Sequence, residues 1–277
     1  MLDLFLTRLH ELMVILYAIS ILFYFIDFID TNRKANRIAF WLLAIVWSMQ
    51  TIFLCFYVIE IGRFPVLTIF EGLYFYAWVL VTLSLTINKF LKMDFIVFFT
   101  NILGFIIIAI HTFAPDDTDS TVMAERLISE LLFTHITMAI LSYAAFSLSF
   151  VFSIVYLIQY DLLKRKKWGK RLRRLSDLSK LETMSYILNI IGVPILLLSL
   201  ILGIQWAFLK LPGLNWFDPK IIGSFIVLIV YSVFLYMKVR RHKTGKSLAL
   251  WNIASFLIVL INFFLFGSLS SFHFWNT

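Results

Sequence analysis

Long uninterrupted runs of apolar residues, separated by short polar segments, dominate the chain. Eight runs are long enough to cross a membrane, because about 20 helical residues span a hydrocarbon core of about 30 Å. Membrane β-barrels show short alternating segments instead. The pattern therefore predicts an all-α polytopic membrane protein with eight transmembrane helices. The predicted spans are residues 10–29, 38–60, 67–88, 95–113, 128–161, 184–209, 221–238 and 248–271, and the fifth is long enough to continue beyond the bilayer.

Composition supports this interpretation. The chain is 61% hydrophobic and 14% charged, with a mean hydropathy of +0.93, whereas soluble proteins contain about a quarter charged residues. No separate soluble segment or internal repeat interrupts the spans, so we expect a single transmembrane domain over residues 1–277. The first apolar run lacks a small-residue cleavage site, and we expect it to remain as a span.

Basic residues are divided unequally between the two sides of the predicted helices. Of the 24 Lys and Arg residues, 19 lie in the segments that follow the first, third, fifth and seventh runs. The positive-inside rule places these segments in the cytoplasm and both termini outside. Because topology explains the net charge of +8, the charge does not indicate nucleic-acid binding.

The most basic segment is a predicted cytoplasmic loop at residues 162–183, which contains KRKKWGKRLRRLSDLSKLE. Trp168, Leu172, Leu175 and Leu178 recur in it at helical spacing, so it can lie as an amphipathic helix on anionic lipid headgroups. Two other interpretations stay open. The segment can be a solvated topology signal, or it can be a docking site for a cytosolic protein.

Four of the five histidines fall at the predicted outer boundary of the membrane: His10, His111, His135 and His273. Ionisable residues at membrane depth often mark functional sites. Zinc sites favour Cys ligands and closer spacing. Haem fits better, because its iron accepts axial histidines from separate helices and its porphyrin suits aromatic walls. The alternative is that each histidine is only an interfacial polar residue.

An aromatic segment, GIQWAFLKLPGLNWFDPKI at residues 203–221, is predicted as an outer loop. Trp206, Trp216 and Phe217 would stack on a porphyrin, and Asp218 would cap the following helix. An interfacial aromatic belt is the alternative interpretation. Glu71, at the start of the third span, can orient a histidine, bind a cation or pair with Arg63.

Three segments resemble motifs of the haem-handling membrane proteins of cytochrome c biogenesis, the CcsA/CcmC family, and most closely its HemX branch. In the family pattern GxVWAxxxWGxYWxWDPKE, the matching residues here are Gly203, Trp206, Ala207, Asp218, Pro219 and Lys220. GRFPVLTIFEGLYFYAW at 62–78 is similar to FPLxNLYESLxFxxW. THITMAILSYAAF at 134–146 is similar to HVxxxxxSYAxF.

The resemblance implies that His135 and His273 are the axial ligands of one b-type haem at the outer face of a bacterial cytoplasmic membrane. His10 and His111 are the next pair to test. It also implies a protein that is not an enzyme and that regulates haem synthesis by keeping glutamyl-tRNA reductase low. The basic loop would contact that enzyme or another cytosolic protein.

Two other functions stay open. The first is haem transport, or haem delivery in cytochrome c biogenesis. The family tryptophans fall here on Leu211, Asn215 and Phe217, and the inner-half histidines of the synthetase branch are missing, which argues against a complete transmembrane haem relay. The second is a membrane scaffold that binds no ligand.

Overall fold

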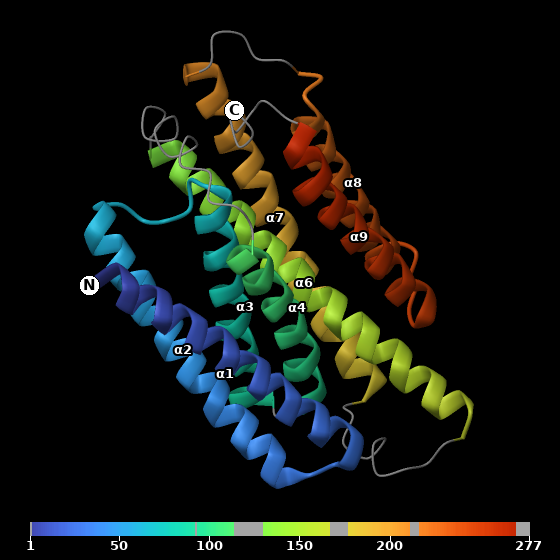
Figure 1. Cartoon of the computed structure of the whole chain (residues 1–277). Helices are drawn as coiled ribbons and strands as arrows, with labels where there is room; N and C mark the ends of the chain where they lie inside the picture. The colour runs from blue at the N-terminus through green and yellow to red at the C-terminus, as the bar shows by residue number, and fades with distance from the viewer. Residues whose placement is uncertain (1, 92, 114–129, 167–176, 211–215, 270–277) are drawn as a thin grey trace. The chain divides into compact units, whose positions relative to one another are not determined.

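The computed structural model describes residues 2–91, 93–113, 130–166, 177–210 and 216–269 (Figure 1). Within these ranges every long element is a helix, and all eight helices are long and apolar enough to cross a membrane. The predicted all-α, multi-pass membrane fold is therefore confirmed. The helices are α1 (Leu2–Asp30), α2 (Arg33–Ile61), α3 (Ile69–Leu91), α4 (Asp94–Phe113), α6 (Glu130–Lys164), α7 (Leu178–Lys210), α8 (Pro219–Val239) and α9 (Lys246–Leu269).

Helix is the form that these apolar runs must take, because hydrocarbon offers no partner for a backbone N–H or C=O. Some of the unpaired backbone groups at the helix ends are satisfied by nearby side chains. Asn32 accepts hydrogen bonds from the N–H groups of Lys34 and Ala35 at the start of α2, as an N-cap residue does. Helix α6 has 35 residues, so at 1.5 Å per residue it is about 52 Å long and exceeds the hydrocarbon core, as predicted.

Helix α7 contains Pro194 in its interior. Proline has no backbone N–H, so the carbonyl of Ile190 loses its usual helical donor at this point. The ladder of backbone hydrogen bonds that runs along α7 is interrupted there, between the half that starts at Leu178 and the half that ends at Lys210.

The chain divides into two compact units, which are described separately. The first comprises residues 1–65, 73–114 and 162–176, with α1, α2, α4 and most of α3. The second comprises residues 66–72, 115–161 and 177–277, with α6 to α9 and the first turn of α3. A single transmembrane domain over residues 1–277 stays a prediction.

Buried polar side chains connect the helices of the first unit. The hydroxyl of Tyr17 in α1 donates to Oδ1 of Asn101 in α4 at 3.0 Å. Nδ2 of Asn101 donates to the hydroxyl of Ser84 in α3 at 2.9 Å. Polar groups at membrane depth need such partners, and their hydrogen bonds fix how the helices face one another.

A similar cluster lies in the second unit, where α8 packs against α7 and α9 (Figure 1). Nδ2 of Asn252 in α9 donates to the hydroxyls of Ser149 and Ser153 in α6 at 2.9 and 2.8 Å. Asn189 in α7 donates to Oδ1 of Asn252 at 3.0 Å. Three helices are thus joined through one buried asparagine.

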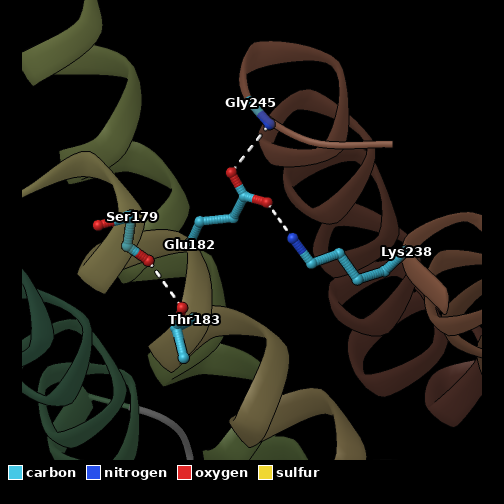
Figure 2. Close-up of polar contacts among 5 residues, drawn as sticks. All are labelled: Ser179, Glu182, Thr183, Lys238 and Gly245. Carbon is cyan, nitrogen blue, oxygen red and sulfur yellow. Dashed lines mark hydrogen bonds and ion pairs between the residues drawn. The ribbon is translucent and has the colours of Figure 1, made fainter. Parts of the chain in front are cut away.

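Glu182, near the start of α7, forms a second junction in this unit, here called the Glu182 junction (Figure 2). One carboxylate oxygen pairs with the ammonium of Lys238 at the end of α8. The other accepts the N–H of Gly245 at 2.9 Å, just before α9. Gly245 has a φ of +77°, a conformation that side chains disfavour. One carboxylate therefore holds three segments together at one end of the unit.

Candidate functional site

The second unit contains a cavity whose walls come from the start of α3 and from α6, α7, α8 and α9. Its volume is about 840 Å³ when the solvent space at its open side is counted. Aliphatic and aromatic side chains make most of the wall, and His135, Ser199 and Lys220 are among its few polar residues. A largely apolar cavity with a few convergent polar groups is the usual form of a small-molecule site.

His135 lies in the wall of this cavity, near the start of α6, with 8% of its surface exposed. Its Nδ1 is 2.6 Å from the backbone carbonyl of Ser199 in α7. A carbonyl only accepts, so Nδ1 carries the proton. In the neutral imidazole Nε2 then holds the lone pair, which is the arrangement of a metal-ligating histidine whose other nitrogen is oriented by a carbonyl. The hydroxyl of Ser199 also donates to the carbonyl of His135 at 2.8 Å.

Gly203 makes room for the imidazole. A Cβ at this position would lie 2.6 Å from Cε1 of His135 and 2.7 Å from its Nδ1, closer than packed atoms approach. Ser199 and Gly203 are four residues apart, so they lie on the same face of α7. The small side chains on this face let α7 approach the histidine of α6 closely.

The segment WFDPK ends at the same cavity. Asp218 accepts the N–H of Lys220 at 2.8 Å, and Pro219 occupies the first position of α8. Asp218 is therefore the N-cap of α8, as expected from the sequence. Lys220 follows in the first turn, and its side chain lies in the cavity wall with 8% of its surface exposed.

The aromatic segment 203–221 is a loop only in part. Residues 203–210 are the last turns of α7, and α8 begins at Pro219. Trp206 is buried and does not line the cavity. Trp216 and Phe217 are 50% and 83% exposed and also lie outside the cavity wall. None of the three aromatic side chains is part of the cavity wall that contains His135, and their stacking on a porphyrin stays a prediction.

His10 and His111 meet in the first unit, with ring centroids 5.4 Å apart. Nε2 of His10 is 3.0 Å from the hydroxyl of Thr112, which itself donates to the carbonyl of Ile108 at 2.8 Å. The hydroxyl therefore accepts the Nε2 proton of His10. The ring of Tyr74 lies 5.4 Å from that of His111. The sequence placed these two histidines at one membrane boundary, and the fold brings them together.

Glu71 has a local role at the start of α3. Its carboxylate accepts the N–H groups of Leu67 and Thr68 at 2.8 and 3.2 Å, and the hydroxyl of Thr68 accepts the N–H of Glu71 at 3.2 Å. This is a reciprocal capping box. Thr68 and Glu71 have the spacing T-x-x-E, which marks such a box in a sequence.

His273, which is predicted to be the second axial ligand of the haem beside His135, lies outside the described residues. Among the residues that the structure describes, no group of three or more His, Cys, Asp and Glu side chains gathers as a metal site would require. Ser199 and Lys220 are site residues that were not predicted. Ser199 orients His135 through a backbone carbonyl, which leaves no trace in a sequence, whereas Lys220 was visible as part of the DPK match.

Comparison with known proteins agrees with this reading of the motifs. The model of the family described as cytochrome c assembly protein matches residues 66–273. A protein named HemX from Bacillus subtilis (strain 168) is 59% identical over the whole of both chains. HemX from Brevibacillus brevis is 46% identical over 96% of this chain and 97% of its own. The cytochrome c biogenesis protein CcsA of Mesostigma viride is 27% identical over 72% of each chain. This chain therefore belongs to the cytochrome c assembly protein family.

Proposed function

We propose that this membrane protein binds haem in the cavity of the second unit, with His135 as an axial ligand. The observation that carries the proposal is the orientation of His135. Its Nδ1 proton is directed to the carbonyl of Ser199, and this leaves Nε2 as the lone-pair nitrogen. The ring is set in a largely apolar wall of the kind that receives a hydrophobic cofactor.

The residues of the cavity fit a haem in three respects. His135 supplies a neutral nitrogen ligand of the type that haem iron takes. Gly203 leaves space for the His135 ring, because a Cβ at this position would displace it. The aliphatic walls favour a porphyrin through burial of its apolar surface. Bound haem would supply an iron centre with a characteristic absorption, and His273 would provide a second nitrogen ligand.

The function we propose is regulatory and not enzymatic. The full-length similarity to two HemX proteins supports a role in which the protein lowers glutamyl-tRNA reductase and so limits haem synthesis, with b-type haem held at the outer membrane face. The basic loop 162–183 is the proposed contact for that enzyme or another cytosolic protein, because clustered cations attract acidic surfaces.

A second candidate function is supported by the family match and by the similarity to CcsA of Mesostigma viride. In this alternative the protein transports haem or delivers it during cytochrome c biogenesis. The two functions share the cavity and differ in what the bound haem is used for.

Absorption spectra of the detergent-purified protein test the haem proposal. The wild type should bind added haem and give a low-spin spectrum, because two nitrogen ligands make the iron six-coordinate. His135→Ala and His273→Ala should each weaken binding and shift the iron to high spin. His242→Ala is the matched control, since this histidine is exposed in the segment between α8 and α9. Wild-type spectra from both His135→Ala and His273→Ala would show that the ligands are elsewhere, and His10 and His111 would be tested next.

A further inference from the structure

The wall of the cavity in the second unit contains a buried lysine, Lys220. The ammonium of Lys220 donates to the backbone carbonyl of Asn262 in α9 at 3.0 Å. It also lies over the ring of Phe263, 5.6 Å from the ring centroid, at the distance of a cation–π contact. Phe263 is itself part of the cavity wall. Helices α8 and α9 thus hold a cationic group beside a space that is otherwise mainly apolar.

A charged group at this depth is costly, because low-dielectric surroundings do not replace its hydration. Nearby Asp218 provides one negative charge at the start of α8, where it accepts the backbone N–H of Lys220. The positive end of the α8 dipole lies at the same place. Lys220 and the helix terminus together make this side of the cavity favourable for an anionic group.

A lysine in such a wall has a chemical use that a methionine of similar length does not have. An ammonium offers three N–H donors, and its charge-assisted hydrogen bonds to carboxylates are short and strong. A ligand with an apolar body and an acidic end would meet aliphatic side chains over most of the cavity and this cation at one point of its wall.

We propose that Lys220 binds a carboxylate of the cavity ligand, so that the site selects an amphipathic acid. This inference rests on the proposed function in one respect: the acid we expect is haem, which carries two propionate groups. His135 would then recognise the metal and Lys220 the carboxylate, and the two residues would contribute separately to affinity.

Comparing haem with haem dimethyl ester tests this division, because esterification removes the propionate charges and leaves the iron. Binding of each to the purified full-length protein would be measured by absorption titration. In Lys220→Met, affinity for haem should fall by about 10- to 100-fold, as for the loss of a charged hydrogen bond, while affinity for the ester changes little. Lys220→Arg, which keeps the charge, should restore part of the preference for the acid. Lys210→Met is the control, since Lys210 is an exposed lysine at the end of α7.

His135→Ala provides the complementary arm. It should weaken haem and its dimethyl ester equally, because both contain iron. Metal-free protoporphyrin should lose affinity in Lys220→Met and keep it in His135→Ala. An equal loss of haem and ester in Lys220→Met, or no loss of either, would overturn the role of Lys220 while leaving haem binding intact.

A labelled fatty acid, oleate, separates failure of the inference from failure of the proposed function. If the wild type binds oleate but no haem, and Lys220→Met abolishes oleate binding, the carboxylate subsite stands and the haem function does not. If the wild type binds neither haem nor oleate, both are wrong. Gel filtration of each variant checks that Lys220→Met is folded. If it is not, Lys220→Gln, which also removes the charge but keeps a polar end, is measured in its place.

Discussion

At the scale of single residues, His135 depends on two features of α7 that act differently. The carbonyl of Ser199 fixes the proton on Nδ1, while Gly203 leaves the space that the ring occupies. The first feature is backbone and survives substitution of the side chain. The second is the absence of a side chain and is lost with a single methyl group.

Gly203→Ala is therefore expected to displace the imidazole, since the new Cβ would lie 2.6 Å from Cε1 of His135. Haem affinity should fall at least about 10-fold, which corresponds to about 1.4 kcal/mol. Absorption titration measures this. Gly72→Ala is the matched control, because a Cβ there would lie 3.7 Å from Cδ1 of Ile140, an ordinary contact in the same cavity wall. Equal affinities of the two variants would argue against the close approach at Gly203.

Ser199→Ala should lower the stability of the protein and leave haem binding unchanged. It removes the hydroxyl that donates to the carbonyl of His135, which costs about 1 kcal/mol of unfolding free energy. The carbonyl that holds Nδ1 remains, so the low-spin haem spectrum should persist. Thermal unfolding and absorption, measured on the same sample, check both parts. A high-spin spectrum in Ser199→Ala would show that the hydroxyl, and not the carbonyl, orients the ring.

The sequence indicates His135 as a candidate haem ligand, but it does not indicate which groups orient the imidazole. A histidine at membrane depth is conspicuous because ionisable residues are rare there. A backbone carbonyl is present in every residue, so nothing distinguishes Ser199 before the fold is known. Burial of the motif aromatics could not be predicted either: Trp206 is buried and is not part of the cavity wall, and its stacking on a porphyrin stays a prediction.

At the scale of elements, helix ends are fixed by polar contacts that hydropathy does not detect. The apolar run predicted a span from residue 184, whereas α7 begins at Leu178. The additional turns are polar, and Glu182 within them joins Lys238 and Gly245 (Figure 2). Helix α8 shows the favourable case, because Asp218 and Pro219 form a start signal that can be read directly.

Glu182→Gln tests the Glu182 junction. The amide keeps an acceptor for the N–H of Gly245 but leaves the mostly buried ammonium of Lys238 without its carboxylate, so we expect a loss of about 1–2 kcal/mol in unfolding free energy. Thermal unfolding in detergent gives the shift. Glu11→Gln is the control, since the Arg8–Glu11 pair is exposed and should contribute less than about 1 kcal/mol. Equal shifts in the two variants would contradict the role assigned to Glu182.

At the scale of the whole molecule, the number of spans could be predicted because the bilayer sets one length and permits few structures. The pairing of distant helices could not. His10 and His111 are brought together by α1 and α4 packing in the first unit, and no local pattern specifies that packing. The orientation of the chain in the membrane rests on charge alone and stays a prediction.

Cysteine labelling in intact cells tests the orientation. Cys55 is first replaced by Ala, because it is exposed on α2. Thr118→Cys should then react with a membrane-impermeant reagent from outside, and Lys243→Cys should react only after permeabilisation. These outcomes follow from the positive-inside rule applied to the 19 basic residues on one side. The reverse pattern would place the termini in the cytoplasm and move the basic loop outside.

Deleting the gene separates regulation from cytochrome assembly. We expect the level of glutamyl-tRNA reductase to rise while c-type cytochromes still mature. Three tryptophans of the family motif are replaced here by Leu211, Asn215 and Phe217, which argues against haem delivery. Immunoblotting and haem staining of membranes measure the two quantities. An unchanged level of the reductase together with missing c-type cytochromes would support the haem-delivery function instead.

Pro194 affects how far the strain from a substitution is transmitted along α7. The Glu182 junction lies on one side of it, and Ser199 and Gly203 lie on the other. Because the backbone ladder is interrupted between them, strain introduced at one half is poorly transmitted to the other. Distant, independent sites contribute additively to free energy. The double variant Glu182→Gln with Gly203→Ala should therefore lose stability as the first variant does and haem affinity as the second does, with no coupling between the two effects.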